Sequence, residues 1–176
     1  MRAATWFQFG VAGLVATMLT MLPTGYAADR AFDPKERDNL ANFDDLDFNV
    51  YSGQKWEQLG KSHAKNIIVH WPDGRMTTGI DVHIEDLKAM FVFAPDTRIK
   101  EHPIRIASGD WTAVTGIMEG TFSKPMPIGD GRTIAPTGKS FKLTMVTIGH
   151  WKDGVMDEEW LMWDNQTFMK QIGLAL

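Results

Sequence analysis

Residues 141–171 read FKLTMVTIGHWKDGVMDEEWLMWDNQTFMKQ, and this stretch decides the fold. Two apolar runs flank the dipeptide Asp153-Gly154, which tolerates the backbone angles of a tight hairpin turn. We therefore predict a long β-hairpin, followed by a helix over residues 165–172. The hairpin also concentrates His, acidic and Trp side chains, so it is the first place to search for a functional site.

The length of the turn decides which residues of the hairpin face one another. A three-residue loop with Gly154 as its bulge glycine pairs positions whose numbers sum to 308. His150 then lies opposite Glu158, and we interpret these two residues as a structural pair that fixes the register. By the same rule, Thr144 lies opposite Asp164. A two-residue loop would shift this pairing by one position.

Both faces of the predicted hairpin are largely apolar. A sheet with one face in water would alternate apolar and polar residues, so we expect one face to line a core or pocket and the other to be covered by further protein, such as a second subunit. Trp160 and Trp163 point to opposite faces, so at most one of them lines the cavity. The two faces consist of Met145, Thr147, Trp151, Leu161 and Trp163, and of Val146, Ile148, Trp160 and Met162.

The first 27 residues are typical of an export signal. Arg2 provides a positive start, residues 7–22 form an almost uncharged apolar run, and small residues precede a cleavage position after Ala27. We predict a signal peptide over residues 1–27, a periplasmic or secreted location, and no stable membrane insertion after cleavage. The alternative is an uncleaved membrane anchor, because the run reaches the low end of the ~17 to 25 residues that span a bilayer.

The bulk properties of residues 28–176 indicate one compact domain. The chain has no Cys, so disulfides do not stabilise it. Its net charge is −4 with scattered Lys and Arg, which argues against a nucleic-acid partner. The five His show no H-E-x-x-H spacing and no two lie close in sequence, so we expect no metal site, and no organic cofactor is implied.

The segments before the hairpin alternate between helical periodicity and apolar runs. Helical spacing predicts helices over residues 34–51, 54–62 and 80–93, and apolar runs bounded by turns predict strands over residues 66–71, 97–107 and 111–122. This order describes an α+β domain. We expect a strongly bent, mixed or antiparallel sheet that wraps around the N-terminal helices as a cone-shaped barrel and leaves a cavity between them.

The order of these elements and the motifs on them resemble the SnoaL-like polyketide cyclases and related ester cyclases of the nuclear transport factor 2-like superfamily. The resemblance runs from Leu46 to Leu174. It implies a cone-shaped α+β barrel, commonly dimeric through its sheet, with a small-molecule pocket at the wide end. The matching motifs are His70-Trp71-Pro72, Thr78-Gly79, Ala94-Pro95-Asp96-Thr97, Gly109-Asp110, Gly120-Thr121-Phe122, Pro136-Thr137-Gly138-Lys139, Lys152-Asp153-Gly154, Glu158-x-Trp160, Asp164 and Gln171-Ile172-Gly173.

The family's acid/base pair is replaced in this chain. The resemblance implies an Asp on the last strand as general acid/base for an intramolecular aldol ring closure, with a His on the preceding strand. Counting outward from the shared Asp-Gly turn, Leu161 falls at the position of the Asp and Thr147 at that of the His. Neither side chain carries a proton in that role.

Two other residues are the local candidates for acid/base chemistry. Asp164 ends the last strand, where the barrel is expected to open, and His70 ends the first strand beside Trp71. Each has a structural alternative: Asp164 is a good N-cap for the terminal helix, and His70 could be a core His bonded to backbone. We expect the ligand to contact Trp71, Trp160 or Trp163, Leu161, Thr147 and Met145.

Two related reactions fit the sequence less well. Ketosteroid isomerases use a Tyr in their oxyanion hole, and the only Tyr after the leader, Tyr51, lies at a helix end. Epoxide hydrolases of this fold, by resemblance, need an Asp-Arg-Asp cluster, and the strand residues Arg98 and Arg105 have no evident acidic partner.

The sequence therefore predicts an exported SnoaL-like protein that binds a small, largely apolar, oxygenated molecule. It would act as an acid/base cyclase or isomerase without a cofactor, and would form a homodimer through its sheet. The alternative is a non-catalytic periplasmic binding or accessory domain, which the replacements at Leu161 and Thr147 favour.

Overall fold

The computed structural model describes residues 31–175, so the predicted signal peptide lies outside the described residues. Three helical segments precede and flank the first strands: α1 (Pro34–Asp45), a π-helical turn η1 (Leu46–Tyr51) and a 3₁₀ helix η2 (Trp56–Lys61). Helix α2 (Ile80–Phe93) follows the first hairpin, and α3 (Asn165–Gln171) ends the chain. No helix within residues 31–175 combines the length and apolarity needed to cross a membrane.

Helix α1 begins at a capping box. The side chain of Asp33 accepts a hydrogen bond from the backbone N–H of Glu36 at 2.9 Å, and the Glu36 carboxylate accepts one from the backbone N–H of Asp33 at 2.9 Å. Pro34 occupies the first helical position, where its missing N–H costs nothing. The predicted apolar stripe is confirmed, because Leu40, Phe43, Leu46 and Val50 are all buried.

One curved, mixed sheet carries the fold. Its strands follow the order β2-β1-β9-β8-β5-β3, with β4 also paired to β5, and only the β1–β9 pair is parallel. The strands are β1 (His63–His70), β2 (Met76–Thr78), β3 (Arg98–Ile99), β4 (Arg105–Ser108), β5 (Trp111–Thr121), β8 (Ser140–Lys152) and β9 (Val155–Trp163), and the short hairpin β6 (Met126–Pro127) and β7 (Thr133–Ile134) stands apart.

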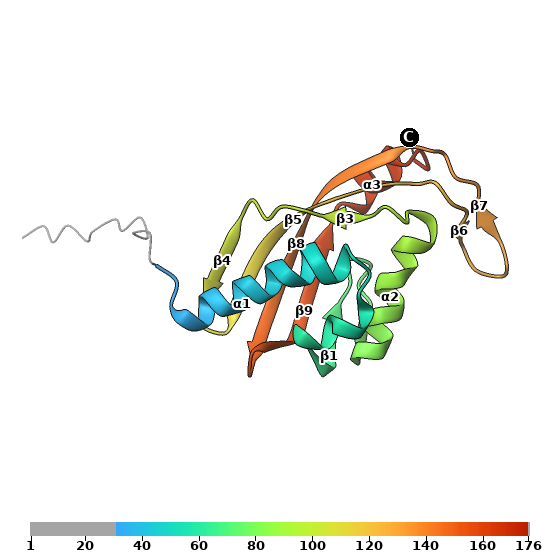
Figure 1. Ribbon diagram of the computed structural model, residues 1–176. Helices are drawn as coiled ribbons and strands as arrows, with labels where there is room; N and C mark the ends of the chain where they lie inside the picture. Colours follow the sequence, from blue (N-terminus) through green and yellow to red (C-terminus); the bar gives the residue numbers. More distant parts are fainter. Residues whose placement is uncertain (1–30, 176) are drawn as a thin grey trace, which may run out of the picture. The chain divides into compact units, whose positions relative to one another are not determined.

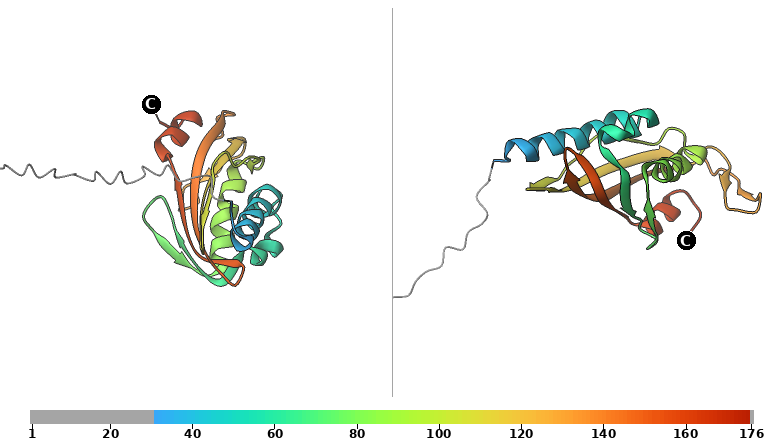
Figure 2. Two further views of the ribbon diagram at one scale, coloured as in Figure 1. Left: turned by 90° about the vertical axis from the view of Figure 1, so that its left-hand side faces the viewer. Right: turned by 90° about the horizontal axis from the view of Figure 1, so that it is seen from below.

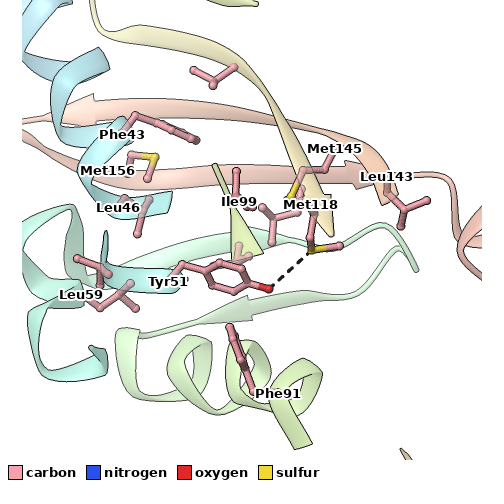
Figure 3. Close-up of a cluster of buried hydrophobic side chains, with 14 of the residues drawn as sticks. Phe43, Leu46, Tyr51, Leu59, Phe91, Ile99, Met118, Leu143, Met145 and Met156 are labelled. Carbon is pink, nitrogen blue, oxygen red and sulfur yellow. Dashed lines mark hydrogen bonds between the residues drawn. The ribbon is translucent and has the colours of Figure 1, made fainter. Parts of the chain in front are cut away.

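The sheet curves around the helices without closing (Figures 1 and 2). Helices α1 and α2 lie against its concave face, and α3 lies at the end where β9 finishes (Figure 2). The α+β class and the cone-like arrangement predicted from sequence are confirmed, with an open sheet in place of a closed barrel. Between helices and sheet lies an apolar core that includes Tyr51, Phe91 and Met118, and the hydroxyl of Tyr51 contacts the sulfur of Met118 at 3.8 Å (Figure 3).

The β8–β9 hairpin forms as predicted, but its turn is shorter. Lys152 pairs with Val155, so the loop has two residues, Asp153 and Gly154, both with positive φ (52° and 82°). A β-bulge at Asp157 then adds one residue to β9, since Trp151 pairs with Met156 and His150 with Glu158. The bulge restores the predicted pairing beyond it, so the expected register is right although the expected three-residue loop is wrong.

Two other segments differ from the sequence-based expectation. The strand predicted over residues 97–107 is two short strands, β3 and β4, separated by a segment that contains Pro103. Proline has no N–H to offer to a sheet, and the neighbouring His102 turns toward carboxylates of α1 and η1. The second difference is β2, which was not predicted; it pairs with β1 through His70 and Met76.

Candidate functional site

A cavity of about 370 Å³ lies between the concave face of the sheet and the helices. Ligand sites for small molecules have volumes of about 300–1,000 Å³ and are mostly apolar with a few polar groups. This cavity matches that description, because aromatic, Met and Leu side chains from α1, η1, α2, α3 and four strands surround a small number of titratable groups. Its polar lining residues include Asp47, Tyr51, His63, His83, Thr147 and Glu159.

Three buried polar residues form a cluster on the cavity wall. His63 opens strand β1, His83 lies in the first turn of α2, and Glu159 lies on the inner face of β9. His83 Nε2 lies 3.0 Å and His63 Nε2 3.7 Å from Glu159 Oε1, and all three residues are at most 3% exposed. Among the described residues, neither Glu159 Oε1 nor His63 Nε2 has a hydrogen-bond partner of acceptable geometry.

The cluster keeps a negative charge inside the domain. Burial alone would raise the pKa of the Glu159 carboxyl, but the positive charge of His83 and the contacts with His63 outweigh it. The pKa of Glu159 therefore lies well below its usual range. Glu159 is ionised at neutral pH, and His83 and His63 are the side-chain partners that a buried carboxylate requires.

A second carboxylate, Asp47, reaches the cavity from η1. His102 contacts both Asp47 and Asp44: its Nε2 lies 2.9 Å from Asp47 Oδ2, and its Nδ1 lies 2.7 Å from Asp44 Oδ1. Burial raises the pKa of Asp47, and the contact with His102 only partly opposes this effect. The side chain of Asp47 is 14% exposed, and it lines the cavity, whereas Asp44 does not.

The phenol of Tyr51 adjoins Asp47 in the cavity wall. Burial, and next the charge of Asp47, raise the pKa of Tyr51 above its ordinary value, so this phenol stays protonated. Within residues 31–175, the one hydrogen-bond contact of its hydroxyl is with a sulfur, Met118 Sδ, at 3.8 Å (Figure 3). A thioether is a weak acceptor, so the Tyr51 hydroxyl is available to a ligand.

The rim of the cavity is polar. Arg75 lies over the ring of Trp71, with its guanidinium carbon 4.7 Å from the ring centroid, and it forms ion pairs with Asp73 (2.9 Å) and Asp86 (3.0 Å). The indole N–H of Trp71 donates to Thr77 Oγ1 at 2.9 Å, which fixes the ring. An apolar interior with a charged rim suits a molecule that is mainly apolar and carries a few oxygens.

Most of the side chains predicted to bind the ligand line the cavity, namely Trp71, Trp163, Leu161, Thr147 and Met145. Trp160 does not. It lies on the outer face of the sheet, where it stacks on His70 with ring centroids 4.6 Å apart and also contacts Trp111. The expectation that only one of Trp160 and Trp163 faces the cavity therefore agrees with the structure, and that residue is Trp163.

Neither predicted acid/base residue lines the cavity. Asp164 caps α3: its carboxylate accepts from the backbone N–H of Thr167 at 3.0 Å and from the Thr167 hydroxyl at 2.6 Å. His70 lies on the outer face, and its Nε2 is 2.7 Å from Glu158 Oε1. The structure thus separates these two residues from the cavity and gives each a structural partner.

The predicted His150–Glu158 pair is only half right. The two residues face each other across the hairpin, as expected. Their side chains have other partners, however, because His150 Nδ1 contacts Asp157 Oδ1 at 2.6 Å and Glu158 contacts His70. The bulge places Asp157 beside His150, which explains the exchange of partners.

The polar groups of the cavity were missed in the sequence. Glu159 is not among the predicted site residues, yet it shares a strand face with Leu161, two residues further on, which is one of them. Asp47 lies four residues after Phe43 and three before Val50, so helical spacing places it on the buried stripe. These spacings could have placed Glu159 and Asp47 in the cavity. No spacing in the sequence, in contrast, predicts that His63 and His83 lie close together.

The fold and the cavity define a class of protein: an α+β cone in which helices and a curved sheet enclose an apolar cavity. The model of the SnoaL-like polyketide cyclase family matches residues 41–172. The chain therefore belongs to the SnoaL-like polyketide cyclase family. No curated protein sequence matches the chain.

Solved structures of low sequence identity share the fold. IdmH of Streptomyces antibioticus, a candidate polyketide cyclase, is 23% identical with a TM-score of 0.64, over 78% of this chain and 98% of that one. A candidate SnoaL-like polyketide cyclase of Jannaschia is 18% identical with a TM-score of 0.72, over 84% and 99% of the two chains. A candidate polyketide cyclase of Acidithiobacillus ferrooxidans is 20% identical with a TM-score of 0.65, over 84% and 100%.

Proposed function

We propose that this protein catalyses an acid/base cyclisation or isomerisation of a small, largely apolar, oxygenated molecule held in the cavity. Family membership supports the cyclase or isomerase class. One observation carries the assignment of residues: a carboxylate with a raised pKa, Asp47, and the buried cluster of His63, His83 and Glu159 line the same apolar cavity. Carboxylates and imidazoles are the usual groups for such proton transfers.

The two carboxylates suit different roles. A general base works best when its pKa lies near the operating pH, and burial moves the pKa of Asp47 in that direction. Glu159 is a poor base because its neighbours hold its pKa low. We assign to Glu159 the role of orienting the imidazoles of His63 and His83, so that His83 can donate a hydrogen bond to an oxygen of the ligand.

The proposed reaction balances without a cofactor. Asp47 removes a proton from a carbon next to a carbonyl, and the resulting enolate oxygen accepts a hydrogen bond from His83 or from the hydroxyl of Tyr51. In a cyclisation, the enolate carbon forms a bond to a second carbonyl carbon of the same molecule, and the new alkoxide takes up a proton. In an isomerisation, the proton returns to a different carbon. The product has the same atoms as the substrate in both cases.

Exchange of carbon-bound hydrogen tests this proposal without knowledge of the natural substrate. The protein is incubated in D₂O with a panel of small apolar ketones and β-keto esters, and loss of the proton next to the carbonyl is followed by NMR. Asp47→Asn should slow catalysed exchange by at least ~10²-fold, the usual contribution of a general base. The matched control is Asp44→Asn, which removes the other carboxylate at His102 but does not line the cavity, and should retain exchange.

A second candidate function is binding without catalysis. The observation that favours it is the presence of Leu161 and Thr147, both in the cavity wall, at the positions where the resemblance implies the family's acid/base pair. Saturable binding of panel members without any catalysed exchange, equal in the wild-type protein and Asp47→Asn, would support this function and contradict the catalytic one.

The assembly and the location are further proposals. The outer face of the sheet presents four exposed apolar side chains, Met76, Ile106, Trp111 and Met162, beside the half-buried Trp160. Exposed apolar side chains on this face favour the homodimer predicted from sequence. Export rests on the sequence of residues 1–27, and the mass of the protein recovered from the cell envelope would test cleavage after Ala27.

A further inference from the structure

We propose that His63, His83 and Glu159 form a binding site for one divalent first-row transition metal ion, with an open coordination position toward the cavity. Each residue offers one ligand atom, and these atoms all lie within 4.8 Å of one another. Two imidazoles and one carboxylate recur as ligands in catalytic zinc sites and in non-haem iron sites. This metal site goes beyond the proposed function, because metal binding can be measured without any substrate or reaction.

The distances in the cluster suit coordination. Ligand atoms about 2.0 to 2.1 Å from a tetrahedral ion lie about 3.3 to 3.4 Å from one another. The separations from Glu159 Oε1 are 3.0 Å to His83 Nε2 and 3.7 Å to His63 Nε2, which bracket that value. Small side-chain rotations therefore suffice to place all three atoms around one ion.

The contacts of Ser62 suit a metal-binding tautomer of His63. The Ser62 hydroxyl lies 3.1 Å from the backbone oxygen of Leu59, which can only accept, and 2.9 Å from His63 Nδ1. One hydroxyl hydrogen serves both contacts when Ser62 donates to Leu59 and accepts from the N–H at Nδ1. His63 Nε2 then offers its lone pair on the side of Glu159, where neither Nε2 nor Glu159 Oε1 has a hydrogen-bond partner among the described residues.

The Ser62 contact is also the arrangement expected around a metal ligand. A metal-bound His usually donates its other ring N–H to a neighbouring oxygen, which fixes the ring and its tautomer. His63 has this partner in Ser62. Glu159 is a carboxylate at most 3% exposed in side chain, and it can provide the negative charge that a divalent ion needs in a buried site.

The chemistry of the ligands selects the class of ion. Imidazole nitrogens suit zinc, iron, cobalt and nickel, whereas magnesium and calcium prefer oxygen ligands. Asp47 remains outside the coordination group, because its carboxylate contacts His102. The ion could polarise a ligand oxygen in place of the His83 N–H donor, and the proposed role of Asp47 as base would not change.

Metal titration of the full chain, purified without a polyhistidine tag and treated with a chelator, tests the inference. We expect one Zn²⁺ or Co²⁺ per chain with micromolar or tighter affinity by calorimetry, and ligand-field absorption from bound Co²⁺. Zinc uptake should release protons, which calorimetry in two buffers of different ionisation enthalpy detects. Glu159→Gln and His83→Gln should each weaken binding by at least about 100-fold.

The outer face of the sheet offers matched controls. His70 and Glu158 also form a His–carboxylate pair, at 2.7 Å, but they lie outside the cavity. His70→Gln and Glu158→Gln should bind metal like the wild-type protein. If a cluster variant does not fold, a second measurement uses folded proteins only. Zinc should raise the melting temperatures of the wild-type protein and of His70→Gln by the same amount.

Two results would overturn the proposed site: the absence of saturable uptake at one ion per chain, or equal uptake by wild type, Glu159→Gln and His83→Gln. Hydrogen exchange in the presence of chelator separates this inference from the proposed function. Catalysed exchange without metal uptake removes the metal site and leaves the acid/base function. Metal uptake without catalysed exchange supports the metal site and contradicts the acid/base function.

Discussion

His83 Nε2 and Glu159 Oε1 lie 3.0 Å apart inside the domain, and this contact links helix α2 to strand β9. This contact thus joins the helix layer to the sheet through an imidazole and a carboxylate. Removal of one member of a buried ion pair leaves the other charge uncompensated, which destabilises proteins far more than the loss of a surface pair.

We predict that Glu159→Gln lowers the free energy of unfolding by about 3 to 5 kcal/mol at pH 7. The pKa of Glu159 is lower in the folded than in the unfolded protein, so its charge stabilises the fold above the unfolded-state pKa of about 4.3. This contribution is lost as the pH falls below that value. Urea unfolding should therefore show a constant difference from wild type between pH 7 and about 5, and a shrinking one at lower pH.

Glu158→Gln is the control for this measurement, because Glu158 is the neighbouring residue with a His partner in a 34% exposed setting. Its effect should be much smaller, as surface ion pairs contribute little. A Glu159→Gln protein as stable as wild type at pH 7 would show that the buried charge does not stabilise the fold.

We predict that Asp164→Asn changes neither stability nor catalysed exchange. Asn is as good an N-cap as Asp, so the contact with the Thr167 backbone persists, and the side chain does not line the cavity. Asp164→Ala should lower the melting temperature, because it removes the cap. Thermal unfolding and the exchange assay together check this. Loss of exchange in a fully folded Asp164→Asn protein would instead support the acid/base role predicted from sequence.

We predict that Met162→Lys dissociates the proposed homodimer. Met162 is 41% exposed on the outer face of the sheet, and a charge there would be buried against the second copy. Light scattering coupled to size exclusion should give twice the chain mass for wild type and the chain mass for the variant. The control is Val92→Lys on helix α2, where Val92 is 52% exposed. A monomeric wild-type protein would contradict the dimer.

Local patterns in the sequence predicted the fold well where the signals for an element lie within that element. Helix α2 matches its predicted range of 80–93, because apolar residues recur at helical spacing between a Gly and a Pro. The hairpin follows from Asp153-Gly154. The strand predicted over 97–107 was wrong because the pairing of His102 with Asp44 and Asp47 depends on elements far away in the sequence.

The site could be predicted only in part for a related reason. The side chains of β8 and β9 that line the cavity follow from strand alternation once the register is known. His63, His83 and Glu159, in contrast, come from two strands and a helix, and their contacts arise only when the sheet bends around α2. Asp164 and His70 were predicted as acid/base residues because they lie at strand ends. In the structure, Asp164 caps a helix and His70 pairs on the outer face, and these roles explain their positions equally well.

The bulge at Asp157 has a consequence for how the length of β9 can change. Strand β9 carries two interleaved sets of side chains, and the register against β8 decides which set faces the cavity. If all residues were kept and Asp157 paired with His150, Glu158, Trp160 and Met162 would turn inward, while Glu159 and Leu161 would turn outward. Deletion of Asp157 would not cause this exchange, because Glu158 would then follow Met156 directly and still lie opposite His150. The bulge thus stores one residue of chain length outside the pairing, so this strand can lose a residue there and keep the same cavity lining.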